Sequence, residues 1–142
     1  MKRFLPLFVL AFATAGVVGC GGPEGVYKLD KEAQKKAAEA DLEKKTGPDK
    51  EFGKAFIGLI DQMDESLELK KDGKAELKTS MPDLMKKGET KSETETGEWK
   101  ADGDTITVKI KDQEMKCKRD GKKLECSGGE KDKESKTFFV KS

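Results

Sequence analysis

Apolar and polar residues alternate along much of the chain after residue 66, and this pattern predicts antiparallel strands. Apolar side chains recur at every second position over 66–77, 99–110 and 115–126, which is the period of a strand with one buried face. An Asp-Gly pair interrupts each stretch, and Asp-Gly favours a two-residue hairpin turn because glycine tolerates positive φ. We therefore predict three hairpins with turns at Asp72-Gly73, Asp102-Gly103 and Asp120-Gly121.

The apolar faces of these hairpins form the predicted core, and Lys and Glu fill the opposite faces. The inward set mixes small and large side chains, so it could fill a narrow barrel completely, which argues against a large internal pocket. The alternative is that some of these residues line a site for a small ligand. The inward set is Leu67, Leu69, Leu77, Trp99, Ile106, Val108, Ile110, Met115 and Leu124.

Two further strands are predicted at the ends of the domain, over Val26–Leu29 and Thr137–Lys141. Eight strands in meander order can close into a small barrel that holds side chains or one small ligand. We predict a mainly β fold: one antiparallel meander barrel of about eight strands over residues 25–142, with a helical insertion over residues 31–64 between the first and second strands.

The helical insertion is predicted from two patterns. Asp30 is suited to cap an Ala-, Lys- and Glu-rich run that extends to Lys45, and Gly47-Pro48 ends it. A second helix follows, because its apolar residues share one face. That face either seals an open end of the barrel or acts as a lid or a membrane-resting surface. The residues of this face are Phe52, Phe56, Leu59, Ile60 and Met63.

The stretch from Met81 to Glu95 predicts a long polar connection, in which Met81, Leu84 and Met85 are the only apolar residues. Such a loop either forms the entrance to a ligand site or is simply a mobile connection.

The N-terminus has the features of an export signal. Lys2 and Arg3 precede an apolar stretch over Phe4–Val18 that is short for a membrane span but typical of a signal peptide. The sequence Val17-Val18-Gly19-Cys20 then resembles the lipobox of bacterial lipoproteins. The resemblance implies that residues 1–19 are removed, that Cys20 carries the lipid that binds the membrane, and that residues 20–24 form a tether. Gly21 in place of Asp favours the outer membrane.

A second resemblance concerns the barrel. The segment Gly97-Glu98-Trp99-Lys100-Ala101-Asp102-Gly103-Asp104-Thr105-Ile106-Thr107-Val108, together with the early strand Gly25–Leu29, resembles bacterial lipocalin-like lipoprotein domains. This resemblance implies a non-enzymatic envelope lipoprotein that binds a small apolar ligand or a peptide. Two alternatives stay open. One is a structural or interaction lipoprotein with a solid core. The other is an inhibitor of a secreted hydrolase, because the chain also resembles small lipid-anchored barrels that inhibit such enzymes.

The cysteines fit an exported protein. If lipid takes Cys20, Cys117 and Cys126 remain as a pair that an oxidising compartment would join. The alternative is two free buried thiols. A turn at Asp120-Gly121 would place Cys117 opposite Leu124, so the bridge would be diagonal or would need a bulge.

Composition narrows the possible chemistry. The chain has no histidine, which excludes His-based catalytic triads and His-ligated zinc. Its 29 basic and 28 acidic residues nearly cancel, which argues against nucleic-acid binding. With 34% hydrophobic and 40% charged residues, the core must be thin. We predict no catalytic residue, no metal site and no cofactor.

Overall fold

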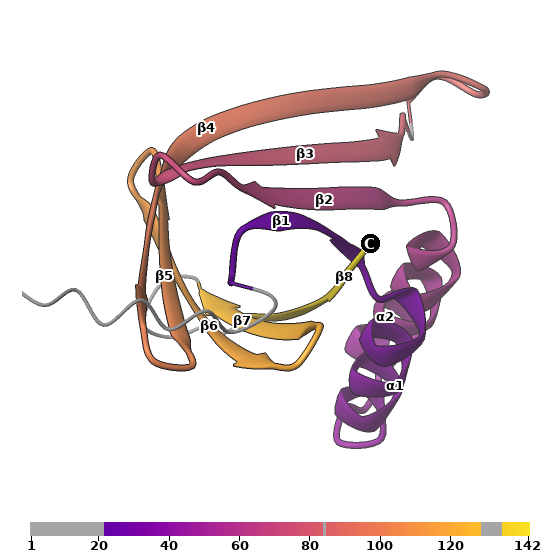
Figure 1. Ribbon diagram of the computed structural model, residues 1–142. Coiled ribbons are helices and arrows are strands. Elements are labelled where there is room, and N and C mark those ends of the chain that lie inside the picture. The colour runs from indigo at the N-terminus through magenta and orange to yellow at the C-terminus, as the bar shows by residue number, and fades with distance from the viewer. Residues whose placement is uncertain (1–21, 84, 129–134) are drawn as a thin grey trace, which may run out of the picture.

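Eight antiparallel strands follow one another around a closed barrel, in which β1 pairs with both β2 and β8 (Figure 1). The structure is a computed structural model that describes residues 22–83, 85–128 and 135–142. The predicted meander barrel of eight strands is confirmed. The strands are β1 (Gly25–Leu29), β2 (Asp64–Leu69), β3 (Lys74–Pro82), β4 (Thr90–Asp102), β5 (Thr105–Ile110), β6 (Gln113–Asp120), β7 (Lys123–Gly128) and β8 (Ser135–Lys141).

Because successive strands run in opposite directions, the barrel has two distinct ends. At one end, the turn end, lie the start of β1, the last residue of β8 and the turns 70–73, 103–104 and 121–122. At the other end, the helix end, lie both helices and the connection 83–89 between β3 and β4. The strand topology alone therefore decides whether a segment lies at the turn end or at the helix end.

Two of the predicted turns lie one residue further along the chain than the Asp-Gly pattern suggested. The turn between β6 and β7 consists of Gly121 and Lys122, and the turn between β4 and β5 of Gly103 and Asp104. Gly121 and Gly103 have φ of 59° and 61°, the left-handed region that glycine adopts without strain. The hairpins were predicted correctly, but the position of these two turns was wrong.

The shifted turn brings the cysteines together. Cys117 lies directly opposite Cys126, and the two form a disulfide. The expectation that Cys117 would face Leu124 is wrong, because Leu124 pairs with Arg119. Both cysteines are 1% exposed, so the bridge is part of the core. The predicted disulfide is confirmed without a diagonal bridge or a bulge.

The inner faces of the strands form one continuous apolar cluster. Six of the nine predicted inward residues belong to it: Leu67, Leu69, Ile106, Val108, Ile110 and Leu124. The other three, Leu77, Trp99 and Met115, are partly buried and pack against it. Tyr27 of β1 and Phe139 of β8 are its largest members. The strands that close the barrel thus also supply much of its interior.

The Gly-x-Trp segment of β4 has a clear local role. A Cβ atom at Gly97 would collide with the backbone oxygen of Lys109, so glycine allows β4 and β5 to approach closely. Two residues later, the Trp99 indole Nε1 donates to the Lys70 carbonyl over 2.8 Å. The Trp99 backbone nitrogen donates to the Gly73 carbonyl over 2.9 Å. Trp99 therefore ties the turn between β2 and β3 to β4.

Two helices lie between β1 and β2, as predicted. Helix α1 (Lys31–Leu42) begins at Asp30, whose side chain accepts a hydrogen bond from the Ala33 nitrogen over 3.0 Å. Helix α2 (Pro48–Ile60) follows. The helices pack closely where Gly53 meets Leu42, since a Cβ atom at Gly53 would overlap the Leu42 side chain. Figure 1 shows the pair beside the barrel at the helix end.

The prediction of a long loop from Met81 to Glu95 is wrong. β3 continues to Pro82 and β4 begins at Thr90, so only residues 83–89 form the connection. The reason is visible in the sequence of β4 over 90–96, which is polar on both faces. A strand without an apolar face lacks the alternation by which strands are identified.

The first prediction concerns the disulfide. Replacing Cys117 and Cys126 together by alanine should lower the free energy of unfolding by about 2.5 kcal/mol, because the bridge closes a loop of about ten residues in the unfolded chain. Urea unfolding of the two proteins measures this difference. Thiol labelling of the denatured, unreduced chain gives an independent check, and two reactive thiols from this pair would contradict the structure.

Candidate functional site

Large hydrophobic side chains are exposed mainly at one end of the molecule. Among the described residues, five are exposed: Val26, Phe52, Phe56, Met81 and Met85. All except Val26 belong to α2 or to the β3–β4 hairpin, at the helix end. A cluster of exposed apolar side chains is more informative than isolated ones, because it marks a binding surface in many soluble proteins.

Three of these side chains, Phe52, Phe56 and Met81, line a groove between α2 and the end of β3, which we call the apolar groove. It encloses about 510 Å³, a volume in the range of small-molecule and peptide sites. Its helical wall comes from residues spaced three and four apart, so that they share one face of α2. The lining residues are Phe52, Ala55, Phe56, Leu59, Met63, Met81 and Pro82, and every one of them is apolar.

The second helical pattern predicted this wall, but not its exposure. Of the residues of α2, only Ile60 is buried, at 1% exposure. Phe52 is 77% exposed and Phe56 is 37% exposed. The expectation that the whole face seals the end of the barrel is therefore wrong for these two residues. The opposite wall, Met81 and Pro82, was missed because residues from 81 onward were expected to form a loop.

Three polar side chains share the inner face of the sheet near the helix end. Glu65 pairs with Thr79, and Thr79 pairs with Glu93. Burial raises the pKa of the Glu65 carboxyl above its usual value. Glu93 instead forms an ion pair with Lys91 over 3.2 Å. The two carboxylates therefore stand in different environments, and among the described residues they belong to no group of three or more that could hold a metal ion.

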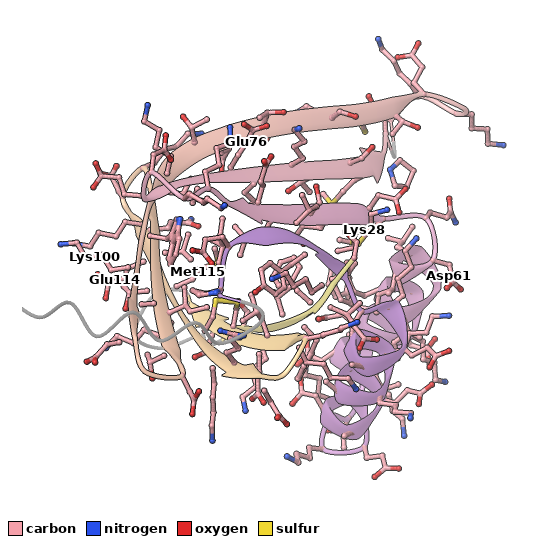
Figure 2. The ribbon with its side chains drawn as sticks, viewed as in Figure 1. Lys28, Asp61, Glu76, Lys100, Glu114 and Met115 are labelled. Atoms are coloured by element: carbon pink, nitrogen blue, oxygen red, sulfur yellow. A yellow bond between two sulfur atoms is a disulfide. The ribbon has the colours of Figure 1, made fainter. Side chains whose placement is uncertain are left out.

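The outer face of the barrel is covered with paired charges. Charged side chains such as Lys100 and Asp61 point away from the barrel in Figure 2. Lys70 and Lys78 each contact Glu76 over 2.9 Å, and these hydrogen bonds lower the pKa of Glu76 to about 2. Charges of both signs at such spacing are typical of a solvated surface.

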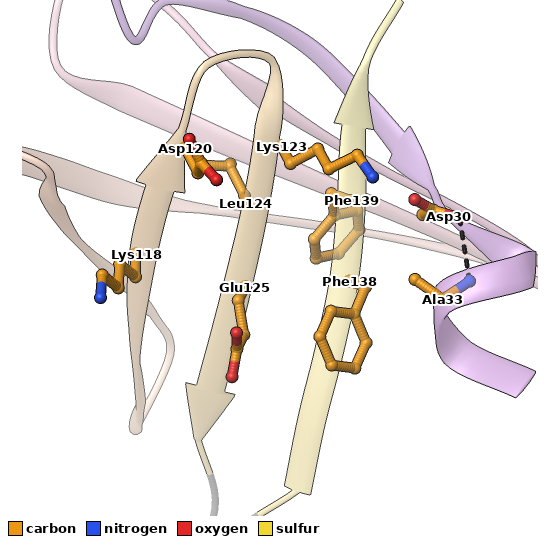
Figure 3. Close-up of a pocket in the computed structure, with 9 residues that line it drawn as sticks. All are labelled: Asp30, Ala33, Lys118, Asp120, Lys123, Leu124, Glu125, Phe138 and Phe139. Carbon is orange, nitrogen blue, oxygen red and sulfur yellow. Dashed lines mark hydrogen bonds between the residues drawn. The ribbon is translucent and has the colours of Figure 1, made fainter. Parts of the chain in front are cut away.

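Two further hollows lie on this outer face, and both have mixed linings. One, of about 370 Å³, lies beside the start of α1, where Ala33 and Phe138 are flanked by charged groups such as Asp30 and Lys123 (Figure 3). The other, of about 600 Å³, crosses β1 to β4 and is lined largely by Lys, Ser, Thr and acidic side chains. The apolar groove is distinct from both because its lining contains no polar side chain.

Other predicted site residues are placed as follows. The lipidation candidate Cys20 lies outside the described residues. Across the described ranges, His, Cys, Asp and Glu side chains form no group of three or more that could hold a metal ion. None of the described helices has the length and hydrophobicity that a membrane span requires.

Neither a protein-family model nor a curated protein matches the sequence.

The second prediction concerns Glu65. Because its pKa is raised in the folded state, the native protein binds a proton more readily at this group than the unfolded chain does. Stability from this group is complete below the ordinary value of 4.5 and is lost as pH rises through the raised pKa. Glu65→Gln should therefore stabilise the protein at pH 7 and have little effect near pH 4.

Urea unfolding at both pH values measures this effect. Glu68→Gln, on the outer face of the same strand, controls for the change in net charge. Equal effects of Glu65→Gln at pH 4 and pH 7 would contradict the prediction.

Proposed function

We propose that this protein is a lipid-anchored, non-enzymatic binding module of the bacterial outer membrane, and that it holds an apolar segment of a partner polypeptide in the apolar groove. The observation that carries the proposal is the wholly apolar lining of an open groove in a chain that is otherwise covered with charge. The lipobox-like sequence ending at Cys20 supports the anchor.

The position of the tether argues against the membrane as the occupant of the groove. The Tyr27 hydroxyl donates to the Pro23 carbonyl over 2.7 Å, and the Lys141 ammonium donates to the Gly22 carbonyl over 3.0 Å. Residues 22 and 23 are therefore docked at the turn end. A lipid on Cys20, two residues earlier, would hold the turn end at the bilayer, so the groove at the helix end would face away from it.

A polypeptide fits the groove better than a ligand enclosed in the barrel. The barrel interior is occupied by buried side chains and the Cys117–Cys126 bridge, which supports a solid core over a lipocalin-type cavity. The groove lies outside this core and extends along α2 from Phe52 to Leu59, a distance of roughly 10 Å at the rise of a helix, and it continues to Met63 beyond the end of the helix. Its two methionines, Met63 and Met81, can adapt their shape to different apolar side chains.

The third prediction concerns the anchor. When cells are fed an alkyne-labelled palmitate, the wild-type chain should incorporate the label and remain with membranes after a carbonate wash. Cys20→Ser should lose both properties, because no other site is proposed to carry lipid. Label on the Cys20→Ser chain, or membrane retention of that chain after the wash, would contradict an anchor at Cys20.

The fourth prediction concerns the groove. Random ten-residue peptides selected for binding should be rich in aromatic and aliphatic residues. Phe52→Asp should weaken their binding at least tenfold, because it places a charge in the apolar lining. Since Phe52 is 77% exposed, the substitution should change the free energy of unfolding by less than about 1 kcal/mol. Fluorescence anisotropy of a selected peptide measures the affinity.

The matched control is Val26→Asp, which also adds a carboxylate at an exposed apolar residue but on β1, outside the groove. It should leave peptide affinity unchanged. Equal losses from Phe52→Asp and Val26→Asp would contradict binding in the groove. Oleate that binds in place of all selected peptides would identify an acyl chain, rather than a polypeptide, as the occupant.

A further inference from the structure

The docked tether lies between two turns of the turn end. Gly22 is held at the seam where β8 meets β1, because the Lys141 ammonium donates to its carbonyl over 3.0 Å. On one side of this seam, the Lys141 backbone nitrogen donates to the Lys122 carbonyl over 2.7 Å, in the turn between β6 and β7. On the other side, Gly25 pairs with Leu69, the last residue before the turn between β2 and β3. The β2–β3 and β6–β7 turns are therefore the neighbours of the tether.

Both neighbouring turns are basic. The β2–β3 turn lies within residues 70–74, which contain three lysines and one acidic residue. The β6–β7 turn lies within residues 118–123, which contain three lysines, one arginine and one acidic residue. We call residues 70–74 and 118–123 the basic turns. At the seam itself, Glu24 and Lys141 contribute one charge of each sign, so the excess of positive charge lies on the two sides of the tether.

Most lysines of the basic turns are available to an external anion. Lys70 is occupied by Glu76, with 2.9 Å between the charged atoms. Lys71, Lys74 and Lys122 are all exposed, and within the described part of the chain they form no ion pair. Unpaired ammonium groups at the tips of turns are well placed to contact a flat, negatively charged surface.

The turn on the opposite side of the barrel has the opposite charge. In the closed order of eight strands, the β4–β5 turn lies across the turn end from the seam of β8 and β1. Asp102 and Asp104 both belong to this turn or flank it, and both are exposed. The nearest basic residue along the chain is Lys100. The turn end thus carries positive charge beside the tether and negative charge opposite it.

We propose that the two basic turns bind the anionic headgroups of the phospholipid bilayer, and that the anchored barrel tilts so that the β4–β5 turn is lifted from the surface. This proposal rests on the proposed anchor at Cys20. The two residues before Gly22 span at most about 7 Å when fully extended, and the field of a charged surface extends about 10 Å at 0.1 M salt. So short a tether keeps its neighbouring turns within the range in which lysine is attracted to an anionic bilayer.

The length of the tether also selects the bilayer over other polyanions. A gap of about 7 Å between the turn end and the membrane is narrower than a single α-helix with its side chains, about 10–12 Å. An acidic protein could not enter such a gap beside the tether. Contact of two turns with the headgroups would also restrict rotation of the barrel about its anchor, and would keep the apolar groove at the helix end away from the bilayer.

A probe in each turn tests the proposed tilt. Asp72→Cys, Asp104→Cys and Asp120→Cys each place one thiol in or beside a different turn and remove one exposed carboxylate, so the three variants have equal net charge. The full chain, purified from its own membranes, is labelled with bimane and reconstituted into vesicles that contain a lipid with a nitroxide on its headgroup. The quenching of bimane fluorescence then reports the proximity of each turn to the headgroups.

Phosphatidylcholine vesicles are compared with vesicles in which one third of the lipid is phosphatidylglycerol. In the anionic vesicles, quenching at positions 72 and 120 should be at least threefold stronger than at position 104. The difference should disappear in phosphatidylcholine, and also in 1 M NaCl, where the Debye length is about 3 Å. Equal quenching at all three positions in the anionic vesicles would overturn the proposal, as would the same difference in both kinds of vesicle.

Charge reversal supplies the matched control. In the Asp72→Cys chain, Lys71→Glu/Lys122→Glu should lower quenching in anionic vesicles to the level found in phosphatidylcholine, because both basic turns lose their net positive charge. Lys50→Glu/Lys87→Glu makes the same change in net charge at exposed residues of the helix end and should leave quenching unchanged. Equal losses from the two double variants would overturn the proposal, since they would show an effect of total charge.

Flotation separates this proposal from the anchor on which it rests. If the chain fails to float with phosphatidylcholine vesicles, the anchor at Cys20 is wrong and the proposal fails with it. If the chain floats with both kinds of vesicle but shows no quenching that depends on phosphatidylglycerol, the anchor stands and only the binding of headgroups by the basic turns is overturned.

Discussion

The pairing of the first strand with the last is the contact on which the rest of this structure depends. β1 meets β8 through Tyr27, Lys28 and Leu29, paired with Lys141, Val140 and Phe139. Well over a hundred residues separate these partners, and contacts so distant in sequence form only after a large loss of chain entropy. Closure is favourable because it buries two of the largest side chains, Tyr27 and Phe139, in the same interior. Without it, both strands would present open edges and the cluster would be exposed on one side.

The sequence predicted those elements whose two faces differ in polarity. The alternation around Leu67 and Ile106 identified both the strands and their buried faces, and the spacing of the apolar residues after Pro48 identified α2. Two features lacked such a signal. The part of β4 over residues 90–96 is polar on both faces, so nothing distinguished it from a loop. The turn before Lys123 was misplaced by one residue because glycine can occupy either central position of a tight hairpin turn, so the Asp-Gly pair alone does not fix the register.

For a related reason, only one of the two walls of the candidate site could be predicted from the sequence. The helical wall of the apolar groove follows from periodicity, but the opposite wall depends on where β3 ends relative to α2. Met81 lies at the end of β3, and the part of β4 that pairs with it has no alternation of apolar and polar residues. The proximity of Met81 to Met63 and Phe56 therefore depends on the tertiary structure and could not be predicted from the sequence. Conversely, the alternation of β4 predicted Trp99 as an inward residue that either packs in the core or lines a ligand site. Its hydrogen bond to the Lys70 carbonyl gives the indole a structural partner instead.

The two chain ends described here lie side by side, since the Ser142 nitrogen donates to the Val26 carbonyl over 3.0 Å. This affects how the protein can be handled. An affinity tag or fluorescent protein fused after Ser142 would be crowded against the docked residues Gly22 and Pro23, and against the bilayer in an acylated protein. It would also compete with a backbone contact that helps hold β1 in place. A tag or epitope inserted into the connection 83–89 would avoid that end but would adjoin the groove. The turn at Lys111-Asp112, which joins β5 to β6 and does not line the apolar groove, is therefore the better position for a reporter.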